Sequence, residues 1–161
     1  MEQDKKLRSA TNNAYCLLRS RPRSESEMRG RLKLKRYDES TIEAVIQSLK
    51  KVDQIDDVKF ANFWVESRMH VNPVGDIILR RELKNKGVPE AIIEGALRDK
   101  AQNYDEYRVA LDVAERRLKR ISGPDRPKAA KKLYDLLLRR GFEYEIVKRV
   151  IGEIIEVADN L

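Results

Sequence analysis

The organisation of this chain follows from one stretch, residues 56–97, which reads DDVKFANFWVESRMHVNPVGDIILRRELKNKGVPEAIIEGAL. Apolar residues recur in this stretch at helical spacing, in three separate runs. Residues suited to begin a helix stand before the three runs: Asp56 and Asp57, then Asn72 and Pro73, then Pro89. Gly87 can end the second run, because glycine takes the left-handed backbone conformation at the lowest cost. The stretch therefore predicts three short helices joined by tight turns.

The second of these helices has a counterpart on either side in the sequence. Position 87 aligns with position 36, 51 residues earlier, and with position 141, 54 residues later. The aligned residues are Met28, Leu79 and Leu133; Leu32, Leu83 and Leu137; and Arg36, Gly87 and Gly141. Repetition at this period is typical of stacked supersecondary units. We predict an all-α fold of three tandem three-helix modules, elongated and able to curve, with modules at residues 1–54, 55–102 and 103–161.

Further local signals place helix ends within the flanking modules. Ser24 and Glu27 have the spacing of a capping box, and Asp38 is a candidate cap for the helix after it. Arg36 stands where the other two modules have glycine, so we expect a tighter or frayed helix end there. A turn is expected at residues 122–125, Ser-Gly-Pro-Asp.

The composition favours a polyanionic or acidic partner. The chain has 161 residues with a formal net charge of +7, and 38% of its residues are charged. Its one cysteine, Cys16, cannot form an internal disulfide bond, which favours a reducing compartment. The N-terminal sequence lacks an apolar signal core, and no apolar run approaches membrane-spanning length. We therefore expect a cytoplasmic protein that does not interact with membranes. A monomer is our working expectation, although these features do not determine the oligomeric state.

Residues suited to catalysis are scarce. The chain has one histidine, His70, and no glycine-rich phosphate loop or nucleophile elbow. Glu66 and His70 share a helix face, but a second histidine or cysteine ligand for a metal ion is missing. Cys16 as a nucleophile would need His70, which lies in another module. We predict no enzyme activity, no catalytic or metal-binding residues and no cofactor.

Two residues of the central stretch allow both structural and functional interpretations. Trp64 recurs with Phe60 and Ala61, so a place in the core is favoured over base stacking. Arg68 could pair with Glu66 or with the Asp56–Asp57 pair, and contact with a ligand is about as plausible.

Basic residues cluster on the equivalent helix of each module. A solvated face is the usual explanation for any single cluster, but stacking of modules would align the clusters into a stripe. Such a stripe suits a phosphate backbone or an acidic groove, and no base-reading pattern accompanies it, so sequence specificity should be low. The candidate contact residues are Arg19, Arg21, Arg29, Arg31, Arg68, Arg80, Arg81, Lys84, Lys86, Lys131, Lys132, Arg139 and Arg140.

The central stretch resembles the signature of the RecX family, bacterial regulators of the RecA recombinase. The residues that carry the resemblance are Asp56-Asp57, Phe60-Ala61, Trp64, Arg68, Gly75, Leu79, Glu82-Leu83, Lys86-Gly87-Val88 and Ile92-Ile93. The first module is similar in Arg19, Arg21, Ser24, Glu27, Met28 and Leu32, and the third in Arg140-Gly141-Phe142. Arg36 departs from the pattern, because the family usually has glycine at the end of that helix.

The resemblance implies a non-enzymatic negative regulator. It would bind the groove of the RecA filament on single- or double-stranded DNA and restrain ATP hydrolysis, strand exchange and coprotease activity in recombinational repair and the SOS response. The residues alone leave two other possibilities open. One is a freestanding, sequence-nonspecific nucleic-acid-binding helical protein, and the other is a helical adaptor for an unrelated partner.

Overall fold

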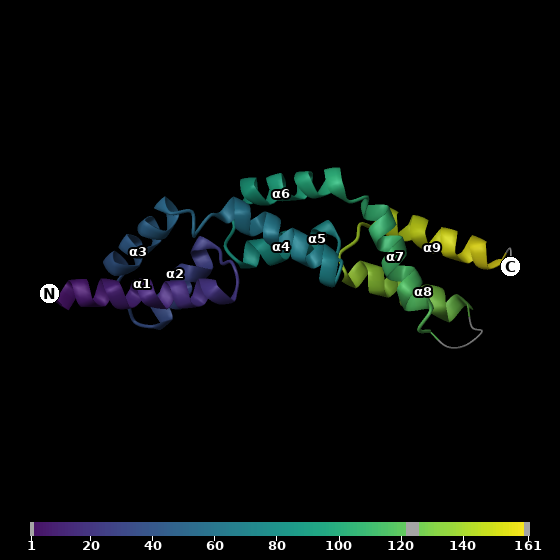
Figure 1. Ribbon diagram of the computed structural model, residues 1–161. Coiled ribbons are helices and arrows are strands. Elements are labelled where there is room, and N and C mark those ends of the chain that lie inside the picture. Colours follow the sequence, from purple (N-terminus) through teal and green to yellow (C-terminus); the bar gives the residue numbers. More distant parts are fainter. Residues whose placement is uncertain (1, 122–125, 160–161) are drawn as a thin grey trace. The chain divides into compact units, whose positions relative to one another are not determined.

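A computed structural model of the chain describes residues 2–121 and 126–159, and within these ranges it contains helices and no strands (Figure 1). The predicted all-α fold of three tandem three-helix modules is confirmed. The turn predicted at residues 122–125 lies outside the described residues.

The first module contains α1 (Glu2–Ser20), α2 (Glu25–Leu34) and α3 (Glu39–Lys51). Its core is built from one apolar face of each helix. The buried residues of the helices are Ala10, Ala14, Met28, Leu32, Ile42, Val45, Ile46 and Leu49, and Ile55 joins them from the segment after α3. They include the apolar positions of α2 and α3 that the helical spacing singles out.

The predicted caps of the first module form. The Ser24 side chain accepts the Glu27 N–H at 3.1 Å, and the Glu27 carboxylate accepts the Ser24 N–H at 3.4 Å, which completes the capping box of α2. Asp38 accepts the Thr41 N–H at 2.9 Å and so caps α3. These contacts provide hydrogen-bond partners for N–H groups that have none within the helix.

The central helices are α4 (Asp57–Val71), α5 (Asp76–Asn85) and α6 (Glu90–Asn103). The predicted start of the second helix at Asn72 and Pro73 is wrong, because α5 begins at Asp76. The backbone before it is engaged elsewhere: Pro73 offers its carbonyl oxygen to the Arg140 guanidinium, and the Gly75 N–H donates to the Arg140 carbonyl oxygen at 2.9 Å.

The C-terminal helices are α7 (Glu106–Leu118), α8 (Arg126–Arg139) and α9 (Tyr144–Asp159). Asp105 caps α7 by accepting the N–H groups of Tyr107 and Arg108. The buried core here consists of Ala110, Leu111, Val113, Ala114, Leu133, Leu137, Phe142, Val147 and Val150.

The chain divides into two compact units. One unit holds the chain up to Trp64 together with Leu83–Ala96, and the other holds Val65–Glu82 together with the chain from Leu97 onward. Each of the three central helices thus contributes to both units. The module boundaries at 54/55 and 102/103 remain predictions.

The second helix of each module ends in the same way, with a residue of positive φ. The φ angles are 62° at Arg36, 72° at Gly87 and 78° at Gly141. In each case the following N–H donates back to the aligned leucine carbonyl: Tyr37 to Leu32 at 3.4 Å, Val88 to Leu83 at 3.1 Å, and Phe142 to Leu137 at 3.2 Å. The expectation of a tighter or frayed end at Arg36 is therefore wrong, since Arg36 adopts the left-handed conformation.

Candidate functional site

The basic residues that the sequence predicts as contact residues fall into two groups. Those with partners inside the chain are Arg21, Arg29, Arg68, Arg80, Lys86 and Arg140. Those that are exposed, and have no hydrogen-bond or ion-pair partner in the described part of the chain, are Arg19, Arg31, Arg81, Lys84, Lys131, Lys132 and Arg139. A role in folding and a role in binding can therefore be separated residue by residue.

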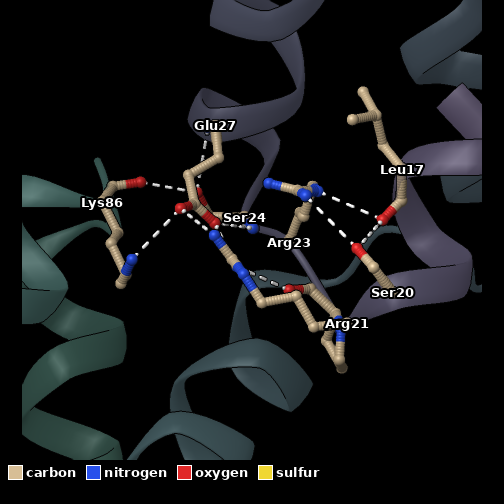
Figure 2. A network of polar contacts seen from close by, with 8 residues as sticks. Leu17, Ser20, Arg21, Arg23, Ser24, Glu27 and Lys86 are labelled. Atoms are coloured by element: carbon tan, nitrogen blue, oxygen red, sulfur yellow. Dashed lines mark hydrogen bonds and ion pairs between the residues drawn. The ribbon is translucent and has the colours of Figure 1, made fainter. Parts of the chain in front are cut away.

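Figure 2 shows the clearest example of the first group, a polar network around Glu27. Arg21 donates hydrogen bonds to the Glu27 carboxylate from its two terminal guanidinium nitrogens, at 2.8 and 3.0 Å. Lys86, at the C-terminal end of α5, donates to the same carboxylate at 3.1 Å. The side chains of Glu27 and Lys86 are each only 18% exposed. Glu27 thus joins the start of α2 to the end of α5 within one compact unit.

Ser24 adds a second link in this network (Figure 2). Its hydroxyl donates to the Lys86 carbonyl oxygen at 2.5 Å while it accepts the Glu27 N–H. Ser24 is fully buried, and both capacities of its hydroxyl group are used. A Cβ atom at Gly87 would lie 2.3 Å from Ser26, so glycine is required here by close approach as well as by its positive φ. We call this contact of Ser24, Ser26 and Glu27 with Lys86 and Gly87 the first joint.

The charges at the first joint alter the acidity of Glu27. Burial favours the neutral carboxyl group, but the hydrogen bonds from Arg21 and Lys86 together outweigh burial and lower the pKa of Glu27 to about 2. Glu27 is therefore ionised throughout the neutral range, and its two cationic partners hold it in that state.

Lys86 also covers an aromatic ring. Its ammonium nitrogen lies 4.0 Å from the centroid of the Trp64 ring, a distance suited to a cation–π interaction. The sequence favours a place in the core for Trp64. That prediction needs correction, because Trp64 is only half-buried. It stacks on the fully packed Phe60 ring, with centroids 6.1 Å apart. Trp64 thus bridges the core and the first joint.

Asp56 and Asp57 have separate roles, although the sequence suggested both as caps of one helix. Asp56 caps α4 by accepting the N–H groups of Val58 at 2.8 Å and Lys59 at 3.0 Å. Asp57 instead accepts the Glu25 N–H at 2.8 Å, at the first turn of α2. Burial raises the pKa of the Asp57 carboxyl group. Two successive carboxylates therefore serve two different helices.

Arg68 has a partner that differs from those the sequence suggested. Its guanidinium binds the Glu82 carboxylate through two bonds of 2.9 and 2.6 Å, and both side chains are about one-quarter exposed, at 26% and 24%. This bidentate pair ties α4 to α5 within the second compact unit. It favours a structural role for Arg68.

The second compact unit contains a helix-to-helix contact of the same kind as the first joint. The N–H groups of Gly75 and Ile77, at the start of α5, donate to the carbonyl oxygens of Arg140 and Gly141 at the end of α8, at 2.9 and 3.3 Å. A Cβ atom at Gly75 would lie 2.1 Å from the Gly141 oxygen, and one at Gly141 would lie 2.7 Å from the Ile78 nitrogen. We call this contact of Gly75, Ile77 and Ile78 with Arg140 and Gly141 the second joint. In both joints the start of one module's second helix packs on the end of the next module's second helix.

One buried charge was not foreseen from the sequence. Lys100, whose side chain is 2% exposed, forms ion pairs with Asp76 and Glu106, the latter at 3.4 Å. Burial raises the pKa of Glu106 despite the nearby ammonium group. Only the position of these residues at the ends of α5, α6 and α7 brings them together, and no local pattern marks them as a group.

Other candidate chemistry finds little support in the described residues. His70 Nδ1 lies 2.9 Å from the Glu66 carbonyl oxygen, so the pair on one helix face interacts internally. No group of three or more histidine, cysteine or acidic side chains suited to a metal ion occurs within residues 2–121 and 126–159. In the same residues, no helix is both long and apolar enough to cross a membrane.

The exposed cations remain as the candidate binding surface. All but Arg19 lie on the second helix of a module: Arg31 on α2, Arg81 and Lys84 on α5, and Lys131, Lys132 and Arg139 on α8. Each extends a mobile charge into solvent, and together they can neutralise phosphate or carboxylate groups of a partner.

Comparison with known proteins agrees with this modular description. Family models match residues 10–49, 56–97 and 104–151 as the first, second and third three-helix domains of RecX. The chain is 36% identical over 152 residues to the regulatory protein RecX of Prosthecochloris aestuarii, covering 94% of this chain and 97% of the relative.

Further relatives extend the match to the whole length and to solved structures. The regulatory protein RecX of Chlorobaculum tepidum is 33% identical, over 100% of this chain and 99% of its own. The crystal structure of RecX from Lactobacillus salivarius matches with a TM-score of 0.77 and 25% identity, covering 93% of this chain and 97% of that one. With three family domains in order and relatives matched from end to end, the chain belongs to the RecX family.

Proposed function

We propose that this protein is a negative regulator of RecA that binds the groove of the RecA filament on DNA. It restrains ATP hydrolysis, strand exchange and coprotease activity, and acts without chemistry of its own. Its setting is recombinational DNA repair and the SOS response, in the cytoplasm, as a monomer. Membership of a family of regulatory proteins supports the regulatory role.

The observation that carries the proposal is the distribution of the exposed cations. Arg31, Arg81, Lys84, Lys131, Lys132 and Arg139 stand on equivalent helices of three modules and lack partners in the described residues. Repeated modules that each supply a weak contact bind a repetitive target more tightly than any one contact does. A filament on DNA is a repetitive target that offers acidic side chains and phosphates.

The experiment is a titration of the protein into a RecA reaction that hydrolyses ATP on single-stranded DNA, at moderate salt. We expect inhibition at ratios well below one molecule per RecA subunit, because a ligand that spans subunits acts on a filament rather than on a subunit. Absence of inhibition, together with salt-sensitive binding to bare DNA, would instead indicate a freestanding nucleic-acid-binding protein.

Charge-reversal variants locate the surface. Arg81→Glu combined with Lys84→Glu should weaken inhibition about tenfold or more, because it replaces attraction by repulsion at two exposed sites. Lys5→Glu combined with Lys6→Glu makes the same change of charge on exposed positions of α1 and should have little effect. Lys86 is left intact because it supports the first joint. Equal loss in both variants would indicate attraction by net charge alone and would contradict the assignment to α5.

A further inference from the structure

One cavity of the second compact unit has an unusual lining. Its volume is about 300 Å³, and four guanidinium groups line it: Arg116 and Arg117 of α7, Arg120 just after α7, and Arg140 at the end of α8. No described residue of the lining is acidic. Asn72 adds an amide group, and exposed Val71 and half-buried Leu136 contribute apolar surface.

These arginines contrast with others of the chain. Half-buried Arg21, Arg29 and Arg68 each bind a carboxylate group. Arg140 is also half-buried, but its hydrogen-bond acceptor among the described residues is the Pro73 carbonyl oxygen, which carries no net charge. Arg116, Arg117 and Arg120 are exposed and have no partner within the described ranges. The cavity therefore carries an excess of positive charge that the protein does not balance.

The electrostatics of Arg140 agree with this excess. Burial and the nearby charge of Arg68 both lower the pKa of the Arg140 guanidinium group. A bound anion in the cavity would raise the pKa of Arg140 again, because it would stabilise the charged guanidinium group. The position of Arg116 and Arg117 at the end of α7 gives them a favourable interaction with the helix dipole, but that interaction needs no shared cavity and does not involve Arg140.

We infer that this cavity binds a phosphate group of a single-stranded nucleic acid, with the adjoining nucleoside against Val71 and Leu136. The inference rests on the proposed function, for which it names one DNA contact. Guanidinium groups bind phosphate oxygens bidentately and stack on unpaired bases. A strand brings successive phosphates to neighbouring arginines, whereas a protein partner would need several acidic side chains converging on one cavity. The mixed charged and apolar lining thus favours a nucleic acid strand.

The test measures binding of a fluorescein-labelled oligothymidylate to the full chain by anisotropy, without RecA. Arg116→Gln combined with Arg120→Gln should lower the affinity about tenfold, and the slope of log K against log salt concentration should become shallower by about one. These residues have no partners in the described chain, so the variant should keep the melting temperature of the wild type, which a thermal scan verifies.

The matched control is Arg108→Gln combined with Lys119→Gln. It removes the same charge from exposed positions of the same segment, outside the cavity lining, and should change the affinity less than about twofold. An unchanged affinity for the Arg116 and Arg120 variant, or an equal loss in the control, overturns the inference. Competition by poly-L-glutamate as effective as that by unlabelled oligothymidylate would also overturn it, by favouring an acidic protein. Competition by inorganic phosphate alone at millimolar concentration would mean that the site selects free phosphate, and would overturn it as well.

Failure of this inference is distinguishable from failure of the proposed function. If the wild type inhibits RecA and the cavity variant binds DNA normally, the cavity assignment fails and the regulatory role stands. If the wild type leaves RecA unaffected but binds DNA through the cavity, the regulatory role fails and the cavity assignment stands.

Discussion

Glu27 and Lys86 are 59 residues apart in the sequence, yet their charged groups lie 3.1 Å apart in the first joint. Arg21 donates to both oxygens of the same carboxylate, so one acidic group balances two cations. The contact links α2 to α5, and it explains why two of the cations that the sequence assigned to a partner are engaged internally.

Acid should weaken the first joint through Glu27. Its pKa is lowered from 4.5 to about 2 in the folded protein, so its contribution to stability is present above about pH 4.5 and is lost as the pH falls towards 2. Glu27→Gln should lower the free energy of unfolding at neutral pH by on the order of 2–3 kcal/mol. It should also reduce the fall in that free energy between about pH 4.5 and 2, which we call the acid limb. Urea melts at a series of pH values measure both effects. Glu39→Gln, at a side chain 74% exposed, serves as the control, and an unchanged acid limb in Glu27→Gln would contradict the assignment.

Trp64 offers a direct signal from the first joint, because it is the only tryptophan of the chain. Lys86→Ala removes the ammonium group that lies over the half-buried ring. The emission maximum should move to longer wavelength as water reaches the indole ring. Lys84→Ala, two residues away and exposed, should leave the spectrum unchanged. A spectrum unaffected by Lys86→Ala would show that the cation does not cover the ring in solution.

Arg36→Gly should stabilise the protein. Arg36 adopts φ of 62°, a conformation that costs a side-chain-bearing residue about 1–2 kcal/mol, while the added freedom of glycine in the unfolded chain offsets part of the gain. We expect a net increase of about 1 kcal/mol in the free energy of unfolding, measured by chemical denaturation. Asp53→Gly is the comparison, since Asp53 has φ of 54° but aspartate tolerates this region better, so its gain should be smaller. A loss of stability in Arg36→Gly would mean that its side chain makes contacts in solution that outweigh the backbone cost.

Two glycine-to-alanine substitutions should have opposite effects. Gly75→Ala places a methyl group against the Gly141 carbonyl oxygen and should destabilise the second unit by more than about 2 kcal/mol. Gly30→Ala, at an exposed position of α2 with nothing within 4 Å of the added atom, should stabilise that helix by up to about 1 kcal/mol. Thermal and urea denaturation of both variants test the pair. Tolerance of alanine at position 75 would show that the second joint can open without cost.

Arg68 and Arg81 should separate folding from binding. Arg68→Ala leaves the Glu82 carboxylate without its bidentate partner and should cost about 1–3 kcal/mol of stability. Arg81→Ala, at an exposed residue with no partner in the described chain, should be close to neutral for stability and should weaken inhibition of RecA. Denaturation and ATPase assays on both variants give the comparison. If Arg68→Ala weakened inhibition without loss of stability, and Arg81→Ala destabilised the protein, Arg68 would belong to the binding surface.

The sequence predicts most of the secondary structure because local signals determine it. The spacing of Ile42, Val45, Ile46 and Leu49 specifies the buried face of α3, and Ser24, Asp38 and Asp56 cap the helices that follow them. Gly87 and Gly141 end their helices as expected. Each of these features depends on residues within about one or two turns of one another.

What the sequence could not predict depends on long-range contacts. Asp57 reaches the start of α2, and α5 begins late because residues 73–75 bond to the end of α8. The two groups of cations also look alike in sequence: Lys84 and Lys86 are two residues apart on one segment, but only Lys86 meets Glu27. Periodicity indicates which face of a helix is polar, but it cannot indicate which polar residue finds a partner in another module.

Arg36 shows a directional property of the joints. Gly87 and Gly141 each receive the start of an earlier module's second helix, at distances that exclude any side chain. Arg36 occupies the same position of the first module, but its side chain is exposed. A side chain at position 36 would prevent another helix from packing on the C-terminal end of α2 in the way that α2 packs at Gly87 and α5 packs at Gly141. In an engineered array, a further module could therefore be docked ahead of the first only after Arg36 is replaced by glycine, which makes this residue an end-stop for repeat extension.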